Sequence, residues 1–216
     1  NEPLKVVIAY DCRNNSKSLA IKVAEVFSAN DIKVFIFSDL RTTPELSFAV
    51  KHLDAHSGIV LTASHNPPEY NGYKVYWKDG GQIVPPQDND IIDRINHTRF
   101  SDIRFNANEG LIEWIDQDVD QAFFDKSVQL GQFDQSGRDK FKIVFTPLHG
   151  TSITAVPQVL AQAAYTDVHL VAAQSSPDGN FPTVKSPNPE EPEDLKMALD
   201  KANEIWADMV IGTDPD

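Results

Sequence analysis

The apolar residues in the first half of the chain form short continuous runs that alternate with segments of helical period. Runs 6–10, 34–37 and 58–62 are mostly apolar and have the length of buried strands. Between them, segments 16–29 and 45–55 each place apolar residues on one helical face. Continuous apolar strands separated by helices are typical of a mostly parallel sheet that is covered on both faces.

The segment after the third run predicts a β-hairpin at an antiparallel edge of this sheet. Residues 73–77 have the length of a strand, and the turn sequence Lys-Asp-Gly-Gly separates them from the short run 82–84. A short helix is expected over 86–97, and a polar connection over 98–118.

The same pattern restarts in the second half. A helical segment at 116–130 precedes a strand at 141–145, a helix at 154–164 and a strand at 168–172. The Pro-rich stretch 175–193 excludes a helix, and a last helix and strand are expected over 195–206 and 207–212.

We therefore expect an α/β protein made of two similar three-layer α/β/α domains with mostly parallel mixed sheets. The predicted domains are 1–115 and 116–216. Trp77, Trp114 and Trp206 are expected to anchor cores. Because the first residue is not Met and the chain stops in the loop after a predicted strand, we also expect a piece of a longer protein.

Composition narrows the range of partners. Lys and Arg number 19 against 32 Asp and Glu, so the net charge of −13 argues against a nucleic-acid or anionic-membrane surface. A small anionic substrate held by a few local cations remains compatible with that charge. Cys12 is the only cysteine, which excludes an internal disulfide and favours the reducing cytoplasm. No apolar run approaches the ~18 residues of a membrane helix.

The segment from Thr62 to Pro68, Thr-Ala-Ser-His-Asn-Pro-Pro, is the richest in candidate chemistry. It leaves the carboxyl end of an apolar strand, where open parallel sheets bind their ligands. Ser64 beside His65 suggests a nucleophile or a phosphate acceptor on a loop that the prolines stiffen. Turn chemistry alone is an equally weighted alternative, and the absence of a Gly-x-Ser-x-Gly sequence disfavours a Ser-His-Asp hydrolase.

Five further polar residues lie near predicted strand ends. The carboxylates of Asp214 and Asp216 suit a hard cation such as Mg²⁺, with a solvated turn as the alternative. Lys74 suits a phosphate or a proton relay, with an exposed edge lysine as the alternative. Arg13 suits phosphate binding or the bracing of its loop, and the bracing role is favoured. His149 suits a position in the wall of a cleft, with a structural role in its own loop as the alternative.

Taken together, these motifs closely resemble the α-D-phosphohexomutases, the phosphoglucomutase and phosphomannomutase enzymes. The resemblance rests on Thr-Ala-Ser-His-Asn-Pro at 62–67 followed by Tyr-Asn-Gly-Tyr-Lys at 70–74, and on Tyr-Asp-Cys-Arg-Asn-Asn-Ser at 10–16. In the second half it rests on Thr-Pro-Leu-His-Gly at 146–150, Asp-Gly-Asn-Phe-Pro at 178–182 and Gly-Thr-Asp-Pro-Asp at 212–216, and it is weakest over 85–135.

The resemblance implies an enzyme that interconverts hexose 1-phosphate and hexose 6-phosphate, of glucose or mannose, through hexose 1,6-bisphosphate. It implies that Ser64 carries the phosphoryl group with His65 and Lys74 beside it, that Arg13 and His149 contact phosphate, and that Ser64, Asp214 and Asp216 hold Mg²⁺. The expected partners are a hexose phosphate and the remaining carboxyl-terminal domains of the same chain. The 216-residue chain alone is expected to be inactive.

Two other functions stay open at this point. A non-catalytic relative that binds sugar phosphates is the first, although a binder has no need for a phosphorylatable serine together with a metal loop. A nucleotide-binding Rossmann domain is the second, and it is disfavoured because no Gly-x-Gly-x-x-Gly follows a strand.

Overall fold

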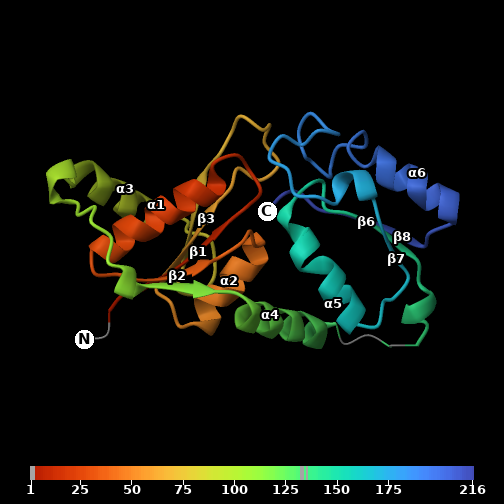
Figure 1. Cartoon of the computed structure of the whole chain (residues 1–216), viewed down its shortest axis with the longest axis horizontal. Coiled ribbons are helices and arrows are strands. Elements are labelled where there is room, and N and C mark those ends of the chain that lie inside the picture. The colour runs from red at the N-terminus through yellow and green to blue at the C-terminus, as the bar shows by residue number, and fades with distance from the viewer. Residues whose placement is uncertain (1–2, 132–133, 135) are drawn as a thin grey trace.

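A five-stranded sheet forms the centre of the first half of the molecule, by which we mean the described residues up to 115; the second half begins at residue 116 (Figure 1). The computed structural model describes residues 3–131, 134 and 136–216. The strand order is β4-β3-β1-β2-β5. The strands are β1 (Lys5–Tyr10), β2 (Lys33–Phe37), β3 (Ser57–Leu61), β4 (Tyr73–Trp77) and β5 (Ile112–Ile115). All neighbours pair in parallel except β3 and β4, which confirms the predicted antiparallel edge.

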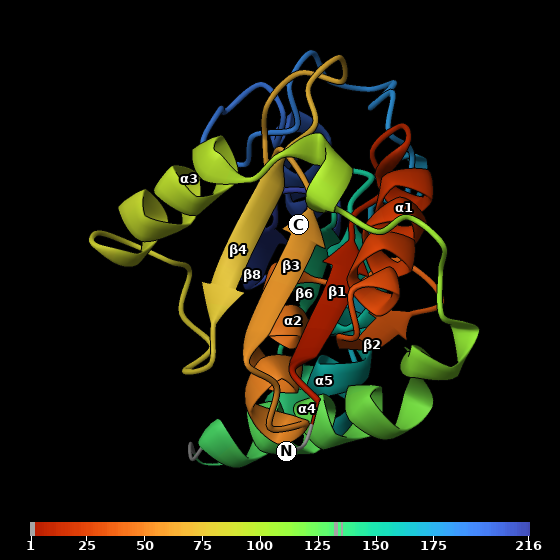
Figure 2. The ribbon, with the colours of Figure 1, turned by 90° about the vertical axis from the view of Figure 1, so that its left-hand side faces the viewer.

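Helices cover both faces of this sheet, as its continuous apolar strands predict. Alternate residues of β1 point to opposite faces. Val7 packs in a core with helix α2 (Thr43–His52), and Ile8 packs in a second core with helix α1 (Ser16–Ala29). Figure 2 shows α1 in front of the strands and α2 behind them. Both cores consist of small or branched apolar side chains, with few aromatic ones.

Strand β5 is a correction to the polar connection expected over 98–118. Ile112–Ile115 pairs in parallel with β2 and so extends the sheet at the edge opposite β4. The strand has only four residues, and its two central side chains, Glu113 and Trp114, are exposed. Glu113 interrupts the apolar residues of this four-residue strand, so the sequence shows no continuous apolar run here.

The second half contains a smaller sheet with the same arrangement of strands. β6 (Ile143–Thr146) lies between β7 (Val168–Leu170) and β8 (Met209–Gly212), just as β1 lies between β2 and β3. All three strands are parallel, so among the described residues this sheet lacks the antiparallel edge of the first. The α/β fold with two similar strand–helix–strand units is confirmed.

The remaining helices join or flank the two sheets. Helix α6 (Lys196–Ile205) packs on one face of the second sheet through Ala198 and Ala202. The others are α3 (Gln87–His97), α4 (Gln117–Leu130) and α5 (Val156–Gln162), with 3₁₀ turns at Phe100–Asp102, Glu109–Leu111, Arg138–Lys140, Thr151–Thr154 and Ala172–Gln174. Helix α4 contacts α2 of the first half and α5 of the second, and thereby joins the halves along one side (Figure 1).

The prediction that the three tryptophans anchor cores is wrong. Trp77, Trp114 and Trp206 are 39%, 52% and 87% exposed. Trp77 and Trp114 lie on β4 and β5, the two edge strands of the sheet. Trp206 follows the end of α6 in a left-handed conformation with φ of 56°, which directs the chain away from the helix axis.

A partly buried ionic cluster joins the residue Arg41, just before α2, to the first turn of α4. Arg41 makes two hydrogen bonds of 2.8 Å to the carboxylate of Asp120 on α4, and its NH2 lies 3.3 Å from Asp116 Oδ1. Glu45, in the first turn of α2, is fully buried, and neither of its carboxyl oxygens has a hydrogen-bond partner among the described residues. Burial, followed by the nearby charge of Asp120, raises the pKa of Glu45 from 4.5 to about 8.

The raised pKa of Glu45 predicts that this carboxyl group makes folding less favourable as the pH rises. The folded chain holds a proton that the unfolded chain releases near pH 4.5, so the free energy of unfolding should fall between pH 4.5 and about 8. Glu45→Gln, which is always neutral, should remove this slope. In urea unfolding, the free energy of unfolding of the variant should rise relative to that of the original chain between pH 5 and pH 8, by at most ~1.4 kcal/mol per pH unit.

The control for this prediction is Glu109→Gln, at an exposed position in a short 3₁₀ turn. This exchange should change the free energy of unfolding by less than ~0.5 kcal/mol at either pH. An equal pH dependence in the Glu45→Gln chain and the original chain would show that Glu45 is ionised in the folded state.

Candidate active site

The carboxyl ends of strands from both sheets meet between the two halves. Residues 11–15 follow β1, 62–72 follow β3, 147–150 follow β6 and 213–216 follow β8. In Figure 1 the carboxyl terminus lies between the halves, close to the loops of the first sheet. Loops at the carboxyl ends of parallel strands are where open α/β sheets bind ligands.

The loop that carries Ser64 has a constrained backbone. Ser64 lies in the left-handed region with φ of 53°, which is unfavourable for a serine and is found where the surrounding structure determines the conformation. The Ser64 amide donates to Thr62 Oγ1 at 2.9 Å, and the Thr62 amide donates to the Gly72 carbonyl at 3.1 Å. A Cβ on Gly72 would lie 2.6 Å from the Thr62 carbonyl oxygen, so only glycine permits this closure of the loop.

The Arg13 guanidinium binds main-chain carbonyls of this loop. Its NH1 donates to the carbonyls of Pro67 and Tyr70 at 2.9 and 3.0 Å, and its NH2 donates to those of Ser64 and Asn66. The Nε lies 3.4 Å from Asp11 Oδ2, and both side chains are fully buried. Since the terminal N–H groups of Arg13 point at main-chain carbonyls, the geometry supports the bracing role rather than phosphate binding.

Asp11 positions Arg13 and the helix that follows it. Its Oδ1 accepts hydrogen bonds from the Arg13 amide at 2.9 Å and from the Ser16 hydroxyl at 2.7 Å, at the start of α1. Burial raises the pKa of Asp11, while these hydrogen bonds and the Arg13 charge oppose the shift. The Asp-x-Arg-x-x-Ser spacing thus produces a single buried unit.

The second half brings Asp214 to Ser64. Ser64 Oγ donates a hydrogen bond of 2.6 Å to Asp214 Oδ2, and His65 Nδ1 lies 3.6 Å from the same oxygen. The sequence separation between Ser64 and Asp214 is 150 residues. The predicted meeting of the serine loop with the aspartate loop is therefore present in this structure.

Asp216 meets Lys74 and the start of α2. Lys74 Nζ lies 2.7 Å from Asp216 Oδ2, which also accepts a hydrogen bond of 3.0 Å from Thr43 Oγ1. The side chain of Asp216 is 5% exposed. Desolvation would raise the pKa of Asp216, but the Lys74 ammonium and the hydroxyls of Ser64 and Thr43 outweigh it and lower the pKa. This carboxylate is therefore ionised, and Lys74 is not a free edge lysine.

The oxygens of Ser64, Asp214 and Asp216 fit a hard divalent cation by their chemistry. Carboxylate and hydroxyl oxygens are the ligands that Mg²⁺ takes in proteins, usually with water and substrate oxygens completing its shell. Over 3–131, 134 and 136–216, no three His, Cys, Asp or Glu side chains are grouped so that they could hold a metal ion. The predicted donor set contains two carboxylates, and the carboxylate of Asp216 is paired with Lys74.

His149 lies away from the serine loop. Its side chain is buried after β6, and its backbone has φ of 63°. Its ring nitrogens contact the Ser176 carbonyl oxygen at 3.2 Å and Thr183 Oγ1 at 2.9 Å. These contacts support the structural alternative, in which His149 stabilises the Pro-rich stretch of its own half.

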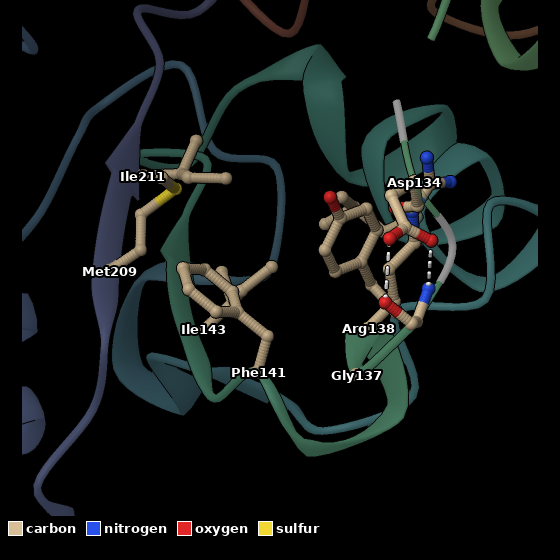
Figure 3. Close-up of a pocket in the computed structure, with 10 residues that line it drawn as sticks. Asp134, Gly137, Arg138, Phe141, Ile143, Met209 and Ile211 are labelled. Atoms are coloured by element: carbon tan, nitrogen blue, oxygen red, sulfur yellow. Dashed lines mark hydrogen bonds between the residues drawn. The ribbon is translucent and has the colours of Figure 1, made fainter. Parts of the chain in front are cut away.

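Two cavities differ in their relation to this site. One of about 360 Å³ has Asp214 and Asp216 in its wall, with apolar side chains of α4 and α5 on the other side. The other, of about 340 Å³, lies at the beginning of β6 and β8 and is lined by Phe141, Ile143 and Met209 (Figure 3). The second cavity is at the opposite end of the strands from Asp214, so it is separate from the candidate site.

Sequence reasoning missed one residue that contacts the site directly. Thr43 bonds to Asp216 through its side chain, and its amide lies 3.3 Å from the Asp216 carbonyl oxygen. Thr-Thr-Pro-Glu at 42–45 is a signature of a helix start, because Thr42 Oγ1 caps the Glu45 amide at 3.3 Å. That signature would have located the helix start at the carboxyl end of β2, at the same edge of the sheet as Ser64.

Comparison with known proteins gives the family. The model of phosphoglucomutase/phosphomannomutase α/β/α domain I matches residues 1–102, and that of domain II matches residues 121–216. The chain therefore belongs to the phosphoglucomutase/phosphomannomutase family. A phosphoglucomutase of Staphylococcus epidermidis is 41% identical over 98% of this chain, and a probable phosphomannomutase of Haemophilus influenzae is 38% identical over 98%.

The chain spans 39% and 44% of the lengths of these two relatives. Among solved structures, a putative phosphomannomutase from Thermus thermophilus aligns with a TM-score of 0.79 at 24% identity, covering 99% of this chain and 46% of that one. A family protein from Burkholderia thailandensis aligns with a TM-score of 0.78 at 24% identity, covering 99% and 44%. These two likenesses confirm the fold. In the part of the chain that the structure describes, no helix has the length and apolar character needed to cross a membrane.

The bracing role of Arg13 predicts a large loss of stability on Arg13→Lys. A single ammonium cannot reach the carbonyls that the guanidinium satisfies, so buried acceptors lose their partners. We expect the free energy of unfolding to fall by ~2–4 kcal/mol, measured by urea denaturation. The control Arg99→Lys, at a position whose side chain is 79% exposed, should change it by less than ~0.5 kcal/mol. Equal effects of the two exchanges would contradict the bracing role.

Proposed function

We propose that this chain supplies the phosphoserine part of the catalytic centre of a phosphohexose mutase. The enzyme would interconvert hexose 1-phosphate and hexose 6-phosphate through hexose 1,6-bisphosphate. One observation carries this proposal: Ser64 Oγ lies 2.6 Å from Asp214 Oδ2, so the candidate phosphoryl carrier of the first half touches the candidate metal loop of the second. Membership of the family supports the same reaction.

In the proposed reaction, phosphorylated Ser64 transfers its phosphoryl group to the free hydroxyl of a hexose monophosphate. The bond from phosphorus to Ser64 Oγ breaks as the bond to the sugar oxygen forms, and the hydroxyl proton passes to a neighbouring base. The bisphosphate then turns around and returns its other phosphoryl group to Ser64, and the released sugar oxygen takes a proton. Such transfers depend mainly on alignment and on neutralising the charge of the phosphoryl oxygens.

Each nearby side chain has a proposed task. As an ammonium, Lys74 neutralises charge on the phosphoryl oxygens. To relay the proton of the sugar hydroxyl, it would first give up its own proton and then accept the hydroxyl proton as a neutral amine. His65 orients the Ser64 hydroxyl or bonds to the phosphoryl group. Ser64, Asp214 and Asp216 would hold Mg²⁺, which when bound withdraws charge from the phosphoryl oxygens. Arg13 and His149, first considered as phosphate ligands, are proposed here as positioning residues.

The substrate and its compartment are proposed only as classes. A relative named phosphoglucomutase and one named probable phosphomannomutase have nearly the same sequence identity to this chain, 41% and 38%. Both glucose and mannose phosphates are therefore proposed substrates. The single cysteine favours a cytoplasmic enzyme. We expect the rest of the full-length protein to complete the grip on the sugar, in line with the share of its relatives that this chain spans.

Ser64→Ala tests the phosphoryl carrier. In the full-length protein, radiolabelled hexose 1,6-bisphosphate should label the original chain and leave the variant unlabelled. Mutase turnover of the variant should fall by several orders of magnitude, because the acceptor oxygen is absent. Ser101→Ala, at an exposed position, serves as the matched control and should retain labelling. Full activity in Ser64→Ala would exclude the carrier role, and no labelling of the original protein would favour the non-catalytic sugar-phosphate binder.

The 216-residue chain on its own should fold and yet fail to turn over a hexose phosphate. Alignment errors of ~1 Å cost about 100-fold in rate, and the relatives are more than twice as long as this chain. A coupled assay with glucose 1-phosphate or mannose 1-phosphate, run beside the full-length protein, measures this. Steady turnover by the short chain would mean that the whole catalytic site lies within these residues.

A further inference from the structure

The Pro-rich stretch of the second half makes direct contacts with the loop that carries Ser64. We call residues 176–186 the clasp. In Figure 1 its ribbon lies beside the serine loop above the gap between the sheets. Ser186 Oγ donates a hydrogen bond to the carbonyl oxygen of His65, the residue next to Ser64. The two bonded residues are 121 positions apart in the sequence.

A second contact joins the clasp to the residue that braces the serine loop. The ring of Phe181 is fully buried, and the Arg13 guanidinium lies 5.1 Å from its centroid. An arginine over an aromatic face is attracted by the ring quadrupole, most strongly when both groups are removed from water. Phe181 therefore covers the guanidinium whose terminal N–H groups bond to the carbonyls of the serine loop.

A third contact depends on a glycine. A Cβ on Gly179 would lie 2.6 Å from the Asn14 amide nitrogen and 2.8 Å from the Cys12 carbonyl oxygen. The backbone of the clasp thus rests directly on the loop after β1, and any larger residue would separate the two. Beside it, Asn14 Nδ2 donates to Asn180 Oδ1 at 3.0 Å.

His149 fixes the clasp to the second half. Its ring bonds to Ser176 and Thr183, as described above, and its carbonyl oxygen accepts the Asp178 amide at 3.0 Å. The clasp is therefore bonded to the end of β6 through His149, and it contacts the first half through Gly179, Phe181 and Ser186. Through these contacts the second half can influence the orientation of the serine loop.

We propose that the clasp is a positioning element that holds the Ser64 loop in its reactive orientation, with Gly179, Phe181 and Ser186 as positioning residues. The inference rests on the proposed function for its kinetic consequence, although its structural part stands without it. Ser64 has an unfavourable positive φ, and such a conformation persists only when contacts on several sides determine it. Arg13 supplies these contacts from the first half, and the clasp supplies them from the second.

Two substitutions test the clasp, each with a matched control. Gly179→Ala inserts a methyl group between the clasp and residues 12–14, and its control is Gly110→Ala, where a Cβ would meet only Asn108 Oδ1, at 3.3 Å. Ser186→Ala removes the hydrogen bond to His65. Its control is Ser175→Ala, whose hydroxyl bonds within its own segment to the Ala172 carbonyl.

The first measurement is amide hydrogen exchange in the 216-residue chain. Gly179→Ala and Ser186→Ala should speed exchange of amides in the serine loop by about five- to thirtyfold, the factor for losing one or two kcal/mol. Exchange within β6 and β8 should stay unchanged, as should every amide of the two control variants outside the exchanged residue. Because this readout needs no activity, it tests the clasp even if Ser64 is not the carrier.

The second measurement is mutase kinetics of the full-length protein. Both clasp variants should lower kcat, by up to ~100-fold, while the KM for the hexose phosphate changes far less, because the clasp orients the serine and does not bind the sugar. Unchanged exchange in the serine loop of both variants would overturn the clasp. Faster exchange with unchanged kcat would overturn its role in positioning and would leave only a structural contact. If Gly179→Ala alone fails to fold, the amide exchange and the kcat of Ser186→Ala decide whether the clasp positions the serine loop.

Discussion

The candidate site depends above all on the buried pair of Arg13 and Asp11. The guanidinium of Arg13 bonds to carbonyls along the Ser64 loop, so that loop has satisfied polar groups although it contains no regular structure. Asp11 offsets the buried positive charge and also bonds to the first turn of α1. One ion pair thereby ties the end of β1, the start of a helix and the reactive loop into one unit. The strained backbone of Ser64 is the local cost of this arrangement.

The charges at the candidate site are compatible with the proposed anionic substrate, although the chain has a net charge of −13. Asp214 and Asp216 bring two carboxylates to the serine, and a phosphoryl group would add further negative charge. Lys74 already compensates Asp216 at 2.7 Å, and a cation on the same oxygens would compensate the remainder. For the proposed phosphoryl group, the overall acidity of the surface would therefore matter less than the few cations held at the site.

The sequence revealed those parts of the molecule that depend on local pattern. Continuous apolar runs identified strands such as β1 and β3, and the ends of the predicted strands located the loops that carry Ser64 and Asp214. That these two loops meet depends on the docking of two separate sheets, and only the resemblance to the mutases implied it. The pattern of the sequence did not predict strand β5, because its central residues are exposed. It predicted a buried Trp206, but a helix end can direct a large side chain into water. The contacts of Ser186 and Phe181 depend on how the two sheets dock, which no local periodicity encodes.

The division of the site between two sheets sets a requirement on the whole molecule. Ser64 and Lys74 belong to the first sheet, while Asp214 and Asp216 belong to the second, so a small shift between the halves would separate hydroxyl from carboxylate. Two connections oppose such a shift on different sides: the pair of Arg41, just before α2, with Asp120 on α4, and the contact of Gly179 with residues 12–14. Since phosphoryl transfer tolerates little misalignment, the proposed reaction would depend on the packing between the halves as much as on the residues proposed to contact the phosphoryl group. In the proposed reaction, a hexose phosphate would have to enter and turn around without separating the two sheets at these points.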